Sequence, residues 1–437
     1  MDDDWVMPST SSPIAIAPVI PAEGVRRESA LPFWCLMFFT FIVLVGPQFL
    51  FPVLQPLHLA KVAAGLAIAV YVFDRLAQRR PLTVNVPAVR LILWFVLLAT
   101  LSIPLSHWPG GSLDLLLTSF SKSLAIFFLL ANTVNTVRRM KLMIGSMAMW
   151  GVILSVAAIR DFWVGNFGLA GLRIASFYSA LTTNANDLAL TLNLILALVI
   201  GLYAAINNPF LKLFLLAAMG LSAAGVIVSF SRGGFLTLVA ILLVPLIKQV
   251  REGRLAPLAG FVVVVLAVPF LFPEGYGDRL YSILDFGYDP TGSARARWQT
   301  LGIAVSIIIE NPLFGVGFGQ DHLAIGEQGG GWTETHNAFL QVGADLGVPG
   351  LLVHLLLIWQ VFKGVRQPRK ELEGLPQGRE LLALRNGIQI ALLAYVVAAF
   401  FHPVPYHFYF YYIAGLAIAF QEMTRPFRVQ AQRLTPA

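Results

Sequence analysis

Residues 292–319 read GSARARWQTLGIAVSIIIENPLFGVGFG, and residues 335–352 read THNAFLQVGADLGVPGLL. Between positions 292 and 350 a nearly continuous series of apolar runs gives way to polar and glycine-rich sequence. Gly315, Gly317 and Gly319 alternate after a proline, which predicts a tight irregular turn. This GxGxG spacing is not a dinucleotide fingerprint, because no alternating strand precedes it and no acidic partner follows it in a βαβ unit. We expect the chemistry of the protein to lie in this stretch.

The composition on either side of this stretch is that of a membrane protein. Of 437 residues, 57% are hydrophobic and only 12% are charged, and the mean hydropathy is +0.75. A soluble globular protein would carry about 25% charged residues. The net charge of +7 therefore indicates basic cytoplasmic loops and does not imply a nucleic-acid partner. The single cysteine, Cys35, excludes an intramolecular disulfide and any cysteine-cluster metal site.

The apolar runs predict an all-α, polytopic membrane protein with about twelve transmembrane helices and a large periplasmic loop that contains short helices. We expect a disordered cytoplasmic tail at 1–31, helices one to nine within 32–272, a catalytic loop at 273–336, helices ten to twelve within 337–421, and a second tail at 422–437. The predicted spans are 32–54, 57–74, 87–106, 113–133, 142–160, 186–206, 210–229, 234–248, 255–272, 337–362, 385–401 and 405–421.

The basic residues predict the orientation of these spans. Clusters at 26–27, 75–80, 138–141, 248–254, 363–385 and 425–433 all fall on one side when the spans alternate. The positive-inside rule makes that side the cytoplasm, so both termini are expected inside and the 273–336 loop outside.

Arginines stand on the predicted outer face, where no lysine accompanies them. A planar, permanently charged guanidinium suits a bidentate grip on phosphate or carboxylate, so these residues indicate an anionic group on that face. The alternative for each is interfacial anchoring or a structural ion pair, which we favour for Arg160 and Arg279 because an aspartate adjoins each. The outer-face arginines are Arg160, Arg173, Arg232, Arg279, Arg295 and Arg297.

Two further polar pieces border predicted spans. Asn184, Asn186 and Asp187 start the 186–206 span, where such residues commonly cap a helix. The glycines at 233 and 234 follow Arg232 and are expected to let the chain reverse in a very short loop. We interpret Arg232 as structural.

Three histidines, His322, His336 and His402, lie on or near the predicted outer face. A water-exposed imidazole there can exchange protons near neutral pH. His336 is flanked by Thr335 and Asn337 where a loop meets a helix, so the alternative is a histidine that hydrogen-bonds backbone at a helix entrance. The outer loops contain no His-x-x-x-His or Glu-x-x-His spacing, so the sequence does not predict a metal site there.

Three pieces of the chain together resemble the O-antigen ligase and polymerase superfamily, whose members are membrane glycosyltransferases that move glycans from undecaprenyl diphosphate. They are RIASFYSALTTNANDLA around Arg173, SRGGFL around Arg232, and the long block quoted above with Arg297 and His336. The resemblance covers roughly residues 170–360, and its large outer loop before the tenth span fits the family's layout.

The resemblance implies a mechanism that needs neither a cofactor nor a metal. Arg173 and Arg297, with Arg295 next, would hold the diphosphate of the donor, and His336 would accept the proton of the attacking sugar hydroxyl. Asp321, Glu327 and Glu334 are candidate helpers. Because no outer carboxylate pair of glycosidase type is evident, direct displacement should invert the anomeric centre.

The leading hypothesis is therefore an O-antigen ligase of the bacterial inner membrane, which transfers a polysaccharide to the lipid A-core oligosaccharide on the periplasmic face. An O-antigen or exopolysaccharide polymerase would use the same donor but accept another lipid-linked repeat, and acceptor choice depends on groove shape that a sequence does not show. A protein O-glycosyltransferase is a weaker alternative. A polysaccharide flippase or secondary transporter would place essential residues deep in its spans rather than in outer loops.

Overall fold

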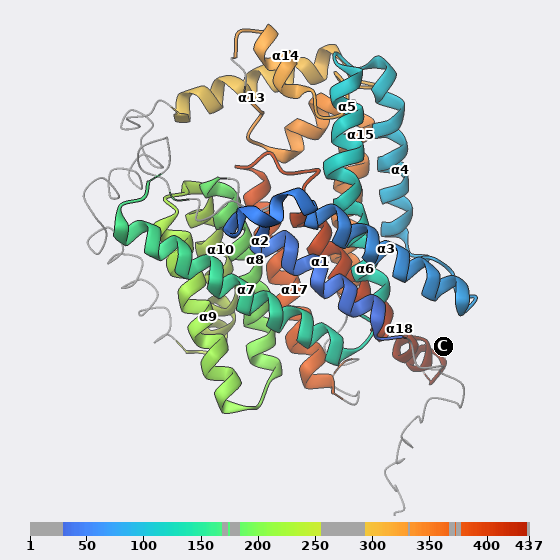
Figure 1. Ribbon diagram of the computed structural model, residues 1–437, viewed down its shortest axis with the longest axis vertical. Helices are drawn as coiled ribbons and strands as arrows, with labels where there is room; N and C mark the ends of the chain where they lie inside the picture. The colour runs from blue at the N-terminus through green and yellow to red at the C-terminus, as the bar shows by residue number, and fades with distance from the viewer. Residues whose placement is uncertain are drawn as a thin grey trace, which may run out of the picture.

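The computed structural model describes residues 29–167, 174, 184–254, 293–330, 333–366, 372 and 377–434, and within them all regular secondary structure is helical. Figure 1 shows the helices gathered into a bundle, with α13 (Ser293–Glu310) and α14 (Asp321–Glu327) together at one end. Both helices belong to the stretch that the sequence predicts as the catalytic loop. We call the end of the bundle at which they lie the site end.

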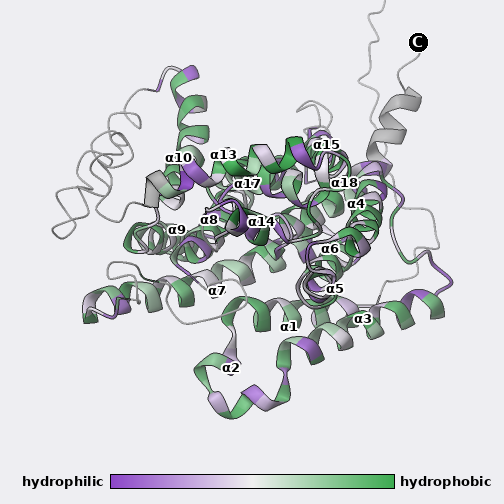
Figure 2. Cartoon of the chain, turned by 90° about the horizontal axis from the view of Figure 1, so that it is seen from above, coloured by the Kyte–Doolittle hydropathy of each residue, from purple (hydrophilic) through white to green (hydrophobic). Residues whose placement is uncertain are grey.

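Eight helical segments of the described chain are long and apolar enough to cross a membrane. Hydrophobic residues run along most of the length of helices such as α7 (Figure 2), as expected where lipid rather than water surrounds a helix. The protein is therefore an integral membrane protein. The segments are Pro87–Leu105 (α4, Pro87–Ser102, with η2, Ile103–Leu105), Pro109–Thr133 (α5, Pro109–Leu115; the π-helical η3, Leu116–Phe120; α6, Ser121–Thr133), α7 (Val137–Val164), α8 (Ala185–Ala205), α9 (Pro209–Val228), α10 (Arg232–Arg251), α15 (Ala338–Val365) and α17 (Gly378–Ala399).

The prediction of an all-helical, polytopic membrane protein is confirmed, and each of these eight segments overlaps a predicted span. The count of twelve stays a prediction, because 255–272 lies outside the described residues. The span predicted at 32–54 is shorter in the structure: α1 (Leu31–Val45) ends where Gly46 turns left-handed with a φ of 62°, and a proline follows. The other described helices are α2 (Pro47–Leu50), η1 (Pro52–Leu57), α3 (Leu59–Ala77) and α18 (Phe408–Leu434).

Helix α8 lies at the centre of the bundle, and 83% of its apolar stretch is buried inside the protein. It packs against α17 at a pair of glycines. A Cβ atom on Gly201 would lie 2.7 Å from the Cα of Gly387, so only glycine permits this approach of the two backbones. Small residues at a helix contact allow the close packing on which membrane bundles depend. This contact fixes the C-terminal half of α8 against α17, while the candidate site lies at the N-terminal end of the same helix.

The glycine turn at 315–319 packs against a break in α15. Gly347 interrupts that helix with non-helical angles (φ 68°, ψ −171°). Ahead of the break, the carbonyls of Ala344 and Asp345 accept hydrogen bonds from the amides of Val316 (2.9 Å) and Gly317 (3.1 Å). The predicted tight turn is confirmed, since its three glycines all have positive φ: Gly315 (64°), Gly317 (107°) and Gly319 (73°).

A short loop at 400–407 joins α17 to α18, and its residues 402–406 are buried. The first half of α18 is also buried and rich in aromatic residues, with Phe410 and Tyr411 among its fully enclosed side chains. Because α18 and α17 are fixed in the core, the 400–407 loop is fixed too. It carries His402 and Tyr406 to the neighbourhood of α8 and α15.

Candidate functional site: a pocket at two helix N-termini

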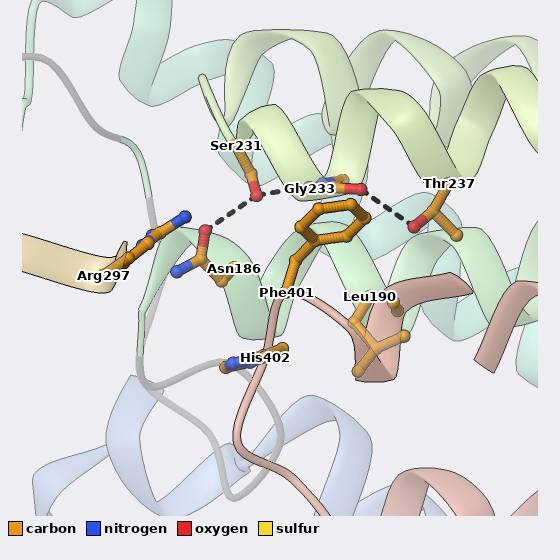
Figure 3. A pocket seen from close by; sticks show the side chains of 10 residues that line it. Asn186, Leu190, Ser231, Gly233, Thr237, Arg297, Phe401 and His402 are labelled. Carbon is orange, nitrogen blue, oxygen red and sulfur yellow. Dashed lines mark hydrogen bonds between the residues drawn. The ribbon is translucent and has the colours of Figure 1, made fainter. Parts of the chain in front are cut away.

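A pocket lies where the N-termini of α8 and α10 meet α13 and the 400–407 loop. Arg297 reaches into it from α13, toward Asn186 and Ser231 (Figure 3). The pocket thus unites segments that are far apart in the sequence. Its lining residues are Asn186, Leu190, Ser231, Gly233, Gly234, Thr237, Arg297, Ala398, Phe401 and His402.

Short polar side chains join the start of α8 to the turn between α9 and α10. The Ser231 hydroxyl donates to the side-chain oxygen of Asn186 at 2.7 Å and accepts from the amide of Gly234 at 3.1 Å. Deeper in the bundle, the amide of the Asn193 side chain donates to the carbonyl of Gly234 at 2.9 Å. Buried polar groups that are satisfied in this way fix the relative position of the two helices.

The glycines of the SRGGFL piece have a different role from the predicted chain reversal. The left-handed residue of this turn is Phe230, with a φ of 56°, while both glycines lie in the first turn of α10. A Cβ on Gly234 would lie 2.4 Å from the Cβ of Ala189, and one on Gly233 would lie 2.9 Å from the Cβ of Phe401. The glycines are needed because α10 approaches α8 and the 400–407 loop closely, and a turn signal alone does not separate these two uses.

Two helix N-termini place partial positive charge at the pocket, where the Asp187 carboxylate contacts the lining residue His402. Asn184 caps α8, since its side-chain oxygen accepts from the amides of Asn186 (2.9 Å) and Asp187 (3.0 Å). Aligned peptide dipoles place partial positive charge at each N-terminus, and Arg297 adds a full charge beside them. The arrangement is suited to an anion. The cap prediction is confirmed for Asn184 and wrong for Asn186 and Asp187, whose side chains reach other segments.

Asp187 is paired with a histidine from the other end of the chain. Its Oδ1 lies 2.8 Å from Nε2 of His402, and both side chains are nearly enclosed, with 10% and 11% of their surface exposed. Asn184 donates to the second oxygen, Oδ2, at 2.9 Å, and Tyr409 also hydrogen-bonds this carboxylate. The aspartate is therefore fixed, and it holds the ring of His402 at the pocket wall.

His336 occupies a short segment, 333–337, that is fixed on both sides. On one side, the amide and hydroxyl of Thr335 donate to Oδ2 of Asp321 at 3.0 and 2.7 Å. On the other, Asn337 caps α15 by accepting from two amides of its first turn, at 3.0 and 3.1 Å. His336 itself has a left-handed backbone with a φ of 51°. This conformation costs a non-glycine residue free energy, and it persists only where the surrounding structure holds it. The imidazole is therefore presented from a rigid position.

Asp321 is part of a fully enclosed polar cluster, which comprises Asp321, Thr335, Gln341, Asp345 and Tyr406 and is called here the Asp321–Asp345 cluster. Asp345 accepts from the Asp321 amide at 2.8 Å and from the Tyr406 hydroxyl at 2.7 Å. Burial raises the pKa of the Asp321 carboxyl, while its hydrogen bonds with Thr335, the charge of His322 and the Gln341 side chain act in the opposite direction. The cluster connects α14, α15 and the 400–407 loop to the segment that carries His336.

Glu334 lies two residues before His336 and within electrostatic reach of Asp321 and Asp187. Loss of water around its carboxyl, with repulsion from Asp321 and then Asp187, raises the pKa of this group to about 7. The residue as a whole is exposed. Its repulsion from Asp187 indicates that the 333–337 segment lies within electrostatic reach of that residue. A carboxyl that titrates near neutral pH is suited to proton exchange.

The predicted site residues fall into three groups. Arg297 lines the pocket. The backbone of Arg295 belongs to α13, but its side chain, like the whole of Arg173, lies outside the described part of the structure. His336 stands on the rigid segment, while His322 and Glu327 lie on α14.

Glu327 contacts a residue that does not line the pocket: its Oε2 lies 3.4 Å from Nδ1 of the His107 ring.

The sequence interpretation did not find the pairing of Asp187 with His402. Each residue was noted singly, one as a helix cap and the other as an outer-face histidine. The available signal was topological: both stand at the predicted outer ends of spans, so both were expected near the same face. Which spans are neighbours within that face depends on packing, and the two residues are 215 positions apart.

The described residues contain no group of three or more His, Cys, Asp or Glu side chains that could hold a metal ion. Cys35 is buried within α1. The functional groups that meet around the pocket are a guanidinium, two helix N-termini, an imidazole–carboxylate pair and side-chain amides. These groups can bind an anion and hold or move a proton.

The fold and the site together describe a polytopic helical membrane protein with an arginine-lined pocket and a histidine on a short fixed segment at one end of the bundle. Residues 217–355 match the family model described as O-antigen ligase, and this match confirms the resemblance to the O-antigen ligase and polymerase superfamily. No curated protein matches the chain. The matched range includes Arg297 and His336, whereas Asp187 precedes it and His402 follows it.

Proposed function

We propose that this protein is an O-antigen ligase, a glycosyltransferase that moves a polysaccharide from undecaprenyl diphosphate to the lipid A-core oligosaccharide. The observation that carries the proposal is the position of Arg297, which lines a pocket at two helix N-termini within the range that matches the O-antigen ligase family. Such a pocket is suited to the diphosphate of a lipid-linked donor. The donor enters laterally from the membrane, as expected for a lipid substrate of an integral membrane protein.

Arg297 holds the diphosphate, and Arg173 and Arg295 are proposed as further contacts. A guanidinium can grip two phosphate oxygens at once, which also orients the donor. When the bond to the anomeric carbon breaks, negative charge develops on the leaving diphosphate. Fixed positive charge beside it, from Arg297 and from the N-termini of α8 and α10, then stabilises the transition state more than the ground state.

His336 is the general base. Its neutral ring accepts the proton of the acceptor hydroxyl as that oxygen bonds to the anomeric carbon, and the electron pair of the breaking bond leaves with undecaprenyl diphosphate. A single displacement of this kind inverts the anomeric centre. The rigid backbone on both sides of His336 supports this role, because a base must stand within hydrogen-bond reach of the proton that it removes.

Glu334 supports the same assignment from a different direction. Its carboxyl titrates at about 7 and is repelled by Asp187, so the segment with His336 and the pocket with Arg297 belong to one electrostatic neighbourhood. Glu334 is proposed to help in removing the proton from His336 after transfer. The donor would then lie with its diphosphate in the pocket and its first sugar toward the 333–337 segment.

The protein is proposed to lie in the inner membrane with both termini in the cytoplasm and the site end in the periplasm, as the basic loops predict. Cysteine labelling tests this orientation. Single cysteines replacing the exposed residues Glu327 and Arg366 should differ in intact spheroplasts. A membrane-impermeant reagent is expected to label the first and not the second, and the reverse pattern would invert the orientation and remove the periplasmic site. The native Cys35 is buried.

A reconstituted transfer reaction tests the function itself. Purified protein is mixed with polysaccharide on undecaprenyl diphosphate and offered lipid A-core in one reaction and a second lipid-linked repeat unit in another. A conjugate on lipid A-core, formed without nucleotide, is the expected result. Elongation of the lipid-linked repeat alone would make the protein a polymerase. No transfer to either acceptor, with the protein folded and the donor bound, would exclude both activities.

A further inference from the structure

The pocket that contains Arg297 has a second polar group whose charge can change. His402 stands in its wall, and the Nε2 atom of the ring lies 2.8 Å from Oδ1 of Asp187. An imidazole has two nitrogens, and a carboxylate on one of them fixes the ring and leaves the other to interact elsewhere. In Figure 3 the ring lies below Phe401 and Asn186, and Arg297 points toward Asn186. His402 and Arg297 therefore line the same pocket.

The charged and titratable groups around the His402–Asp187 pair come from five segments. Asp187 on α8 is acidic and contacts the ring, Glu334 on the 333–337 segment is repelled by Asp187, and Arg297 on α13 lines the same pocket. On the loop that carries His402, burial lowers the pKa of His407, while the charge of Asp187 opposes this shift and that of His402 adds to it. Tyr409 on α18 contributes a neutral hydroxyl that hydrogen-bonds Asp187.

We propose that His402, held by Asp187, carries a proton when the donor is bound and is a direct cationic contact to its diphosphate, beside Arg297. The inference rests on the proposed function, because it takes the ligand of the pocket to be a diphosphate. In the protonated ring both nitrogens are donors: Nε2–H donates to Asp187, and Nδ1–H donates to a diphosphate oxygen. His402 is thus a catalytic residue that acts on the leaving group, whereas His336 acts on the acceptor.

Two opposite requirements for protonation follow within one site. His336 must be neutral to accept a proton, and His402 must be charged to bind the leaving diphosphate. Activity should accordingly be limited by His336 at low pH and by His402 at high pH, which gives a bell-shaped dependence of rate on pH. The arriving diphosphate supplies the negative charge that stabilises the His402 proton, so donor binding and protonation are coupled.

Affinity for farnesyl diphosphate, a short water-soluble polyprenyl diphosphate, tests this coupling by titration calorimetry at several pH values. His402→Gln is the informative variant, because the glutamine amide can still donate to Asp187 but cannot become charged. A hydrogen bond to a charged group is worth tenfold or more in affinity, by an estimate of about 1.5–3 kcal/mol. The variant should bind at least about tenfold more weakly than wild type near pH 6, and the difference should largely vanish near pH 9.

Asp187→Asn provides a second variant in case His402→Gln does not fold. Without the carboxylate the ring loses its proton more readily, so the fall in affinity with rising pH should move to lower pH. His322→Gln is the matched control, since it removes another site-end histidine and should follow the wild-type curve. A constant ratio of affinities between His402→Gln and wild type across pH, or an unmoved curve for Asp187→Asn, would overturn the proposal and leave the pair as a packing contact.

Arg297→Gln separates this inference from the proposed function. If Arg297→Gln weakens farnesyl diphosphate binding at every pH while His402→Gln shows no pH-dependent loss, the diphosphate site stands and only the role of His402 fails. If Arg297→Gln binds as wild type does, the pocket is not the diphosphate site, and the proposed function loses its main support.

Discussion

The 400–407 loop supplies an aromatic partner to each of two carboxylates, and the two pairs differ in their surroundings. Tyr406 donates to Asp345 at 2.7 Å inside the Asp321–Asp345 cluster, where Asp345 is 0% exposed. His402 contacts Asp187 at 2.8 Å, but this pair stands in the wall of the pocket beside Arg297. The Tyr406–Asp345 pair is enclosed by hydrogen-bonded protein groups, whereas His402 of the other pair lines the pocket.

The difference separates a structural use of a buried carboxylate from a chemical one. In the enclosed cluster every partner is a protein group from α14, α15 or the loop, so the hydrogen bonds hold these segments together. At the pocket, the same kind of pairing holds a titratable ring next to a positive charge. Variants of the enclosed cluster should therefore change stability, and variants of Arg297 and His336 should change activity at nearly unchanged stability.

The largest loss of activity is expected from His336→Ala. A positioned general base contributes about 10²- to 10⁴-fold to a rate, so glycan transfer should fall by that factor while expression and donor binding persist. The measurement is single-turnover transfer from a prebound donor. The wild-type rate should also rise with pH on the acid side, because only the neutral ring accepts a proton.

His322→Ala is the control for the loss of a histidine at the site end, and it should retain most of the activity. A folded His336→Ala protein that transfers glycan at more than about a tenth of the wild-type rate would exclude a proton-transfer contribution of the expected size. His336 would then be a helix-entrance residue with a structural role, like the members of the Asp321–Asp345 cluster.

The next largest effect is expected from Asp345→Ala in the enclosed cluster, and it should appear as lost stability. The change leaves the Tyr406 hydroxyl and the Asp321 amide buried without their acceptor, at a cost of about 1–3 kcal/mol for each group. The melting temperature in detergent should fall clearly. Tyr406→Phe removes only the donor and should be milder. A melting temperature equal to that of wild type in Asp345→Ala would show that the cluster does not hold the segments together.

Arg297→Lys should reduce donor affinity and turnover with little change in melting temperature. Lysine keeps the charge but loses the bidentate fork, and a charge-assisted hydrogen bond is worth about 1.5–3 kcal/mol, which corresponds to tenfold or more. The comparison variant is Arg295→Lys on the same helix. Wild-type kinetics for Arg297→Lys together with an inactive Arg295→Lys would transfer the diphosphate contact to Arg295.

Gly234→Ala should have the smallest effect, and it should change both stability and donor binding. The new methyl group would meet the Cβ of Ala189 at 2.4 Å, so α10 must shift away from α8, at about 1–3 kcal/mol for overpacking. Both the melting temperature and the donor affinity should fall. Gly220→Ala in α9 meets no atom within 4 Å and should be neutral or slightly stabilising. Equal behaviour of the two variants would contradict close α8–α10 packing.

The sequence predicted those features that depend on local pattern. Hydropathy located eight spans, the alternating glycines located the turn at 315–319, and the position of Asn184 located a helix cap, because each depends on a few neighbouring residues. Arg297 and His336 were singled out by charge, setting and family resemblance. The structure adds their surroundings, namely the pocket that Arg297 lines and the rigid segment that holds His336.

What the sequence could not predict depends on which helices are neighbours. The contact of Asp187 with His402 joins residues 215 positions apart, and that of Asp345 with Tyr406 joins residues 61 positions apart. The sequence around each residue does not indicate which distant residue it contacts. The use of Gly233 and Gly234 for close packing was likewise hidden, since glycines at a helix start also suit a turn. The side chains of Arg173 and Arg295 lie outside the described residues, so their proposed roles rest on their predicted outer-face position and on the resemblance.

A structure of the protein in a lipid nanodisc with bound undecaprenyl diphosphate would test the central claim most directly. The account predicts diphosphate oxygens within about 2.7–3.2 Å of the Arg297 guanidinium, in the pocket formed by the N-termini of α8 and α10, with His402 in its wall. It also predicts that the 333–337 segment borders the position of the first sugar. A diphosphate bound elsewhere, with this pocket empty and Arg297 turned from the ligand, would contradict the account.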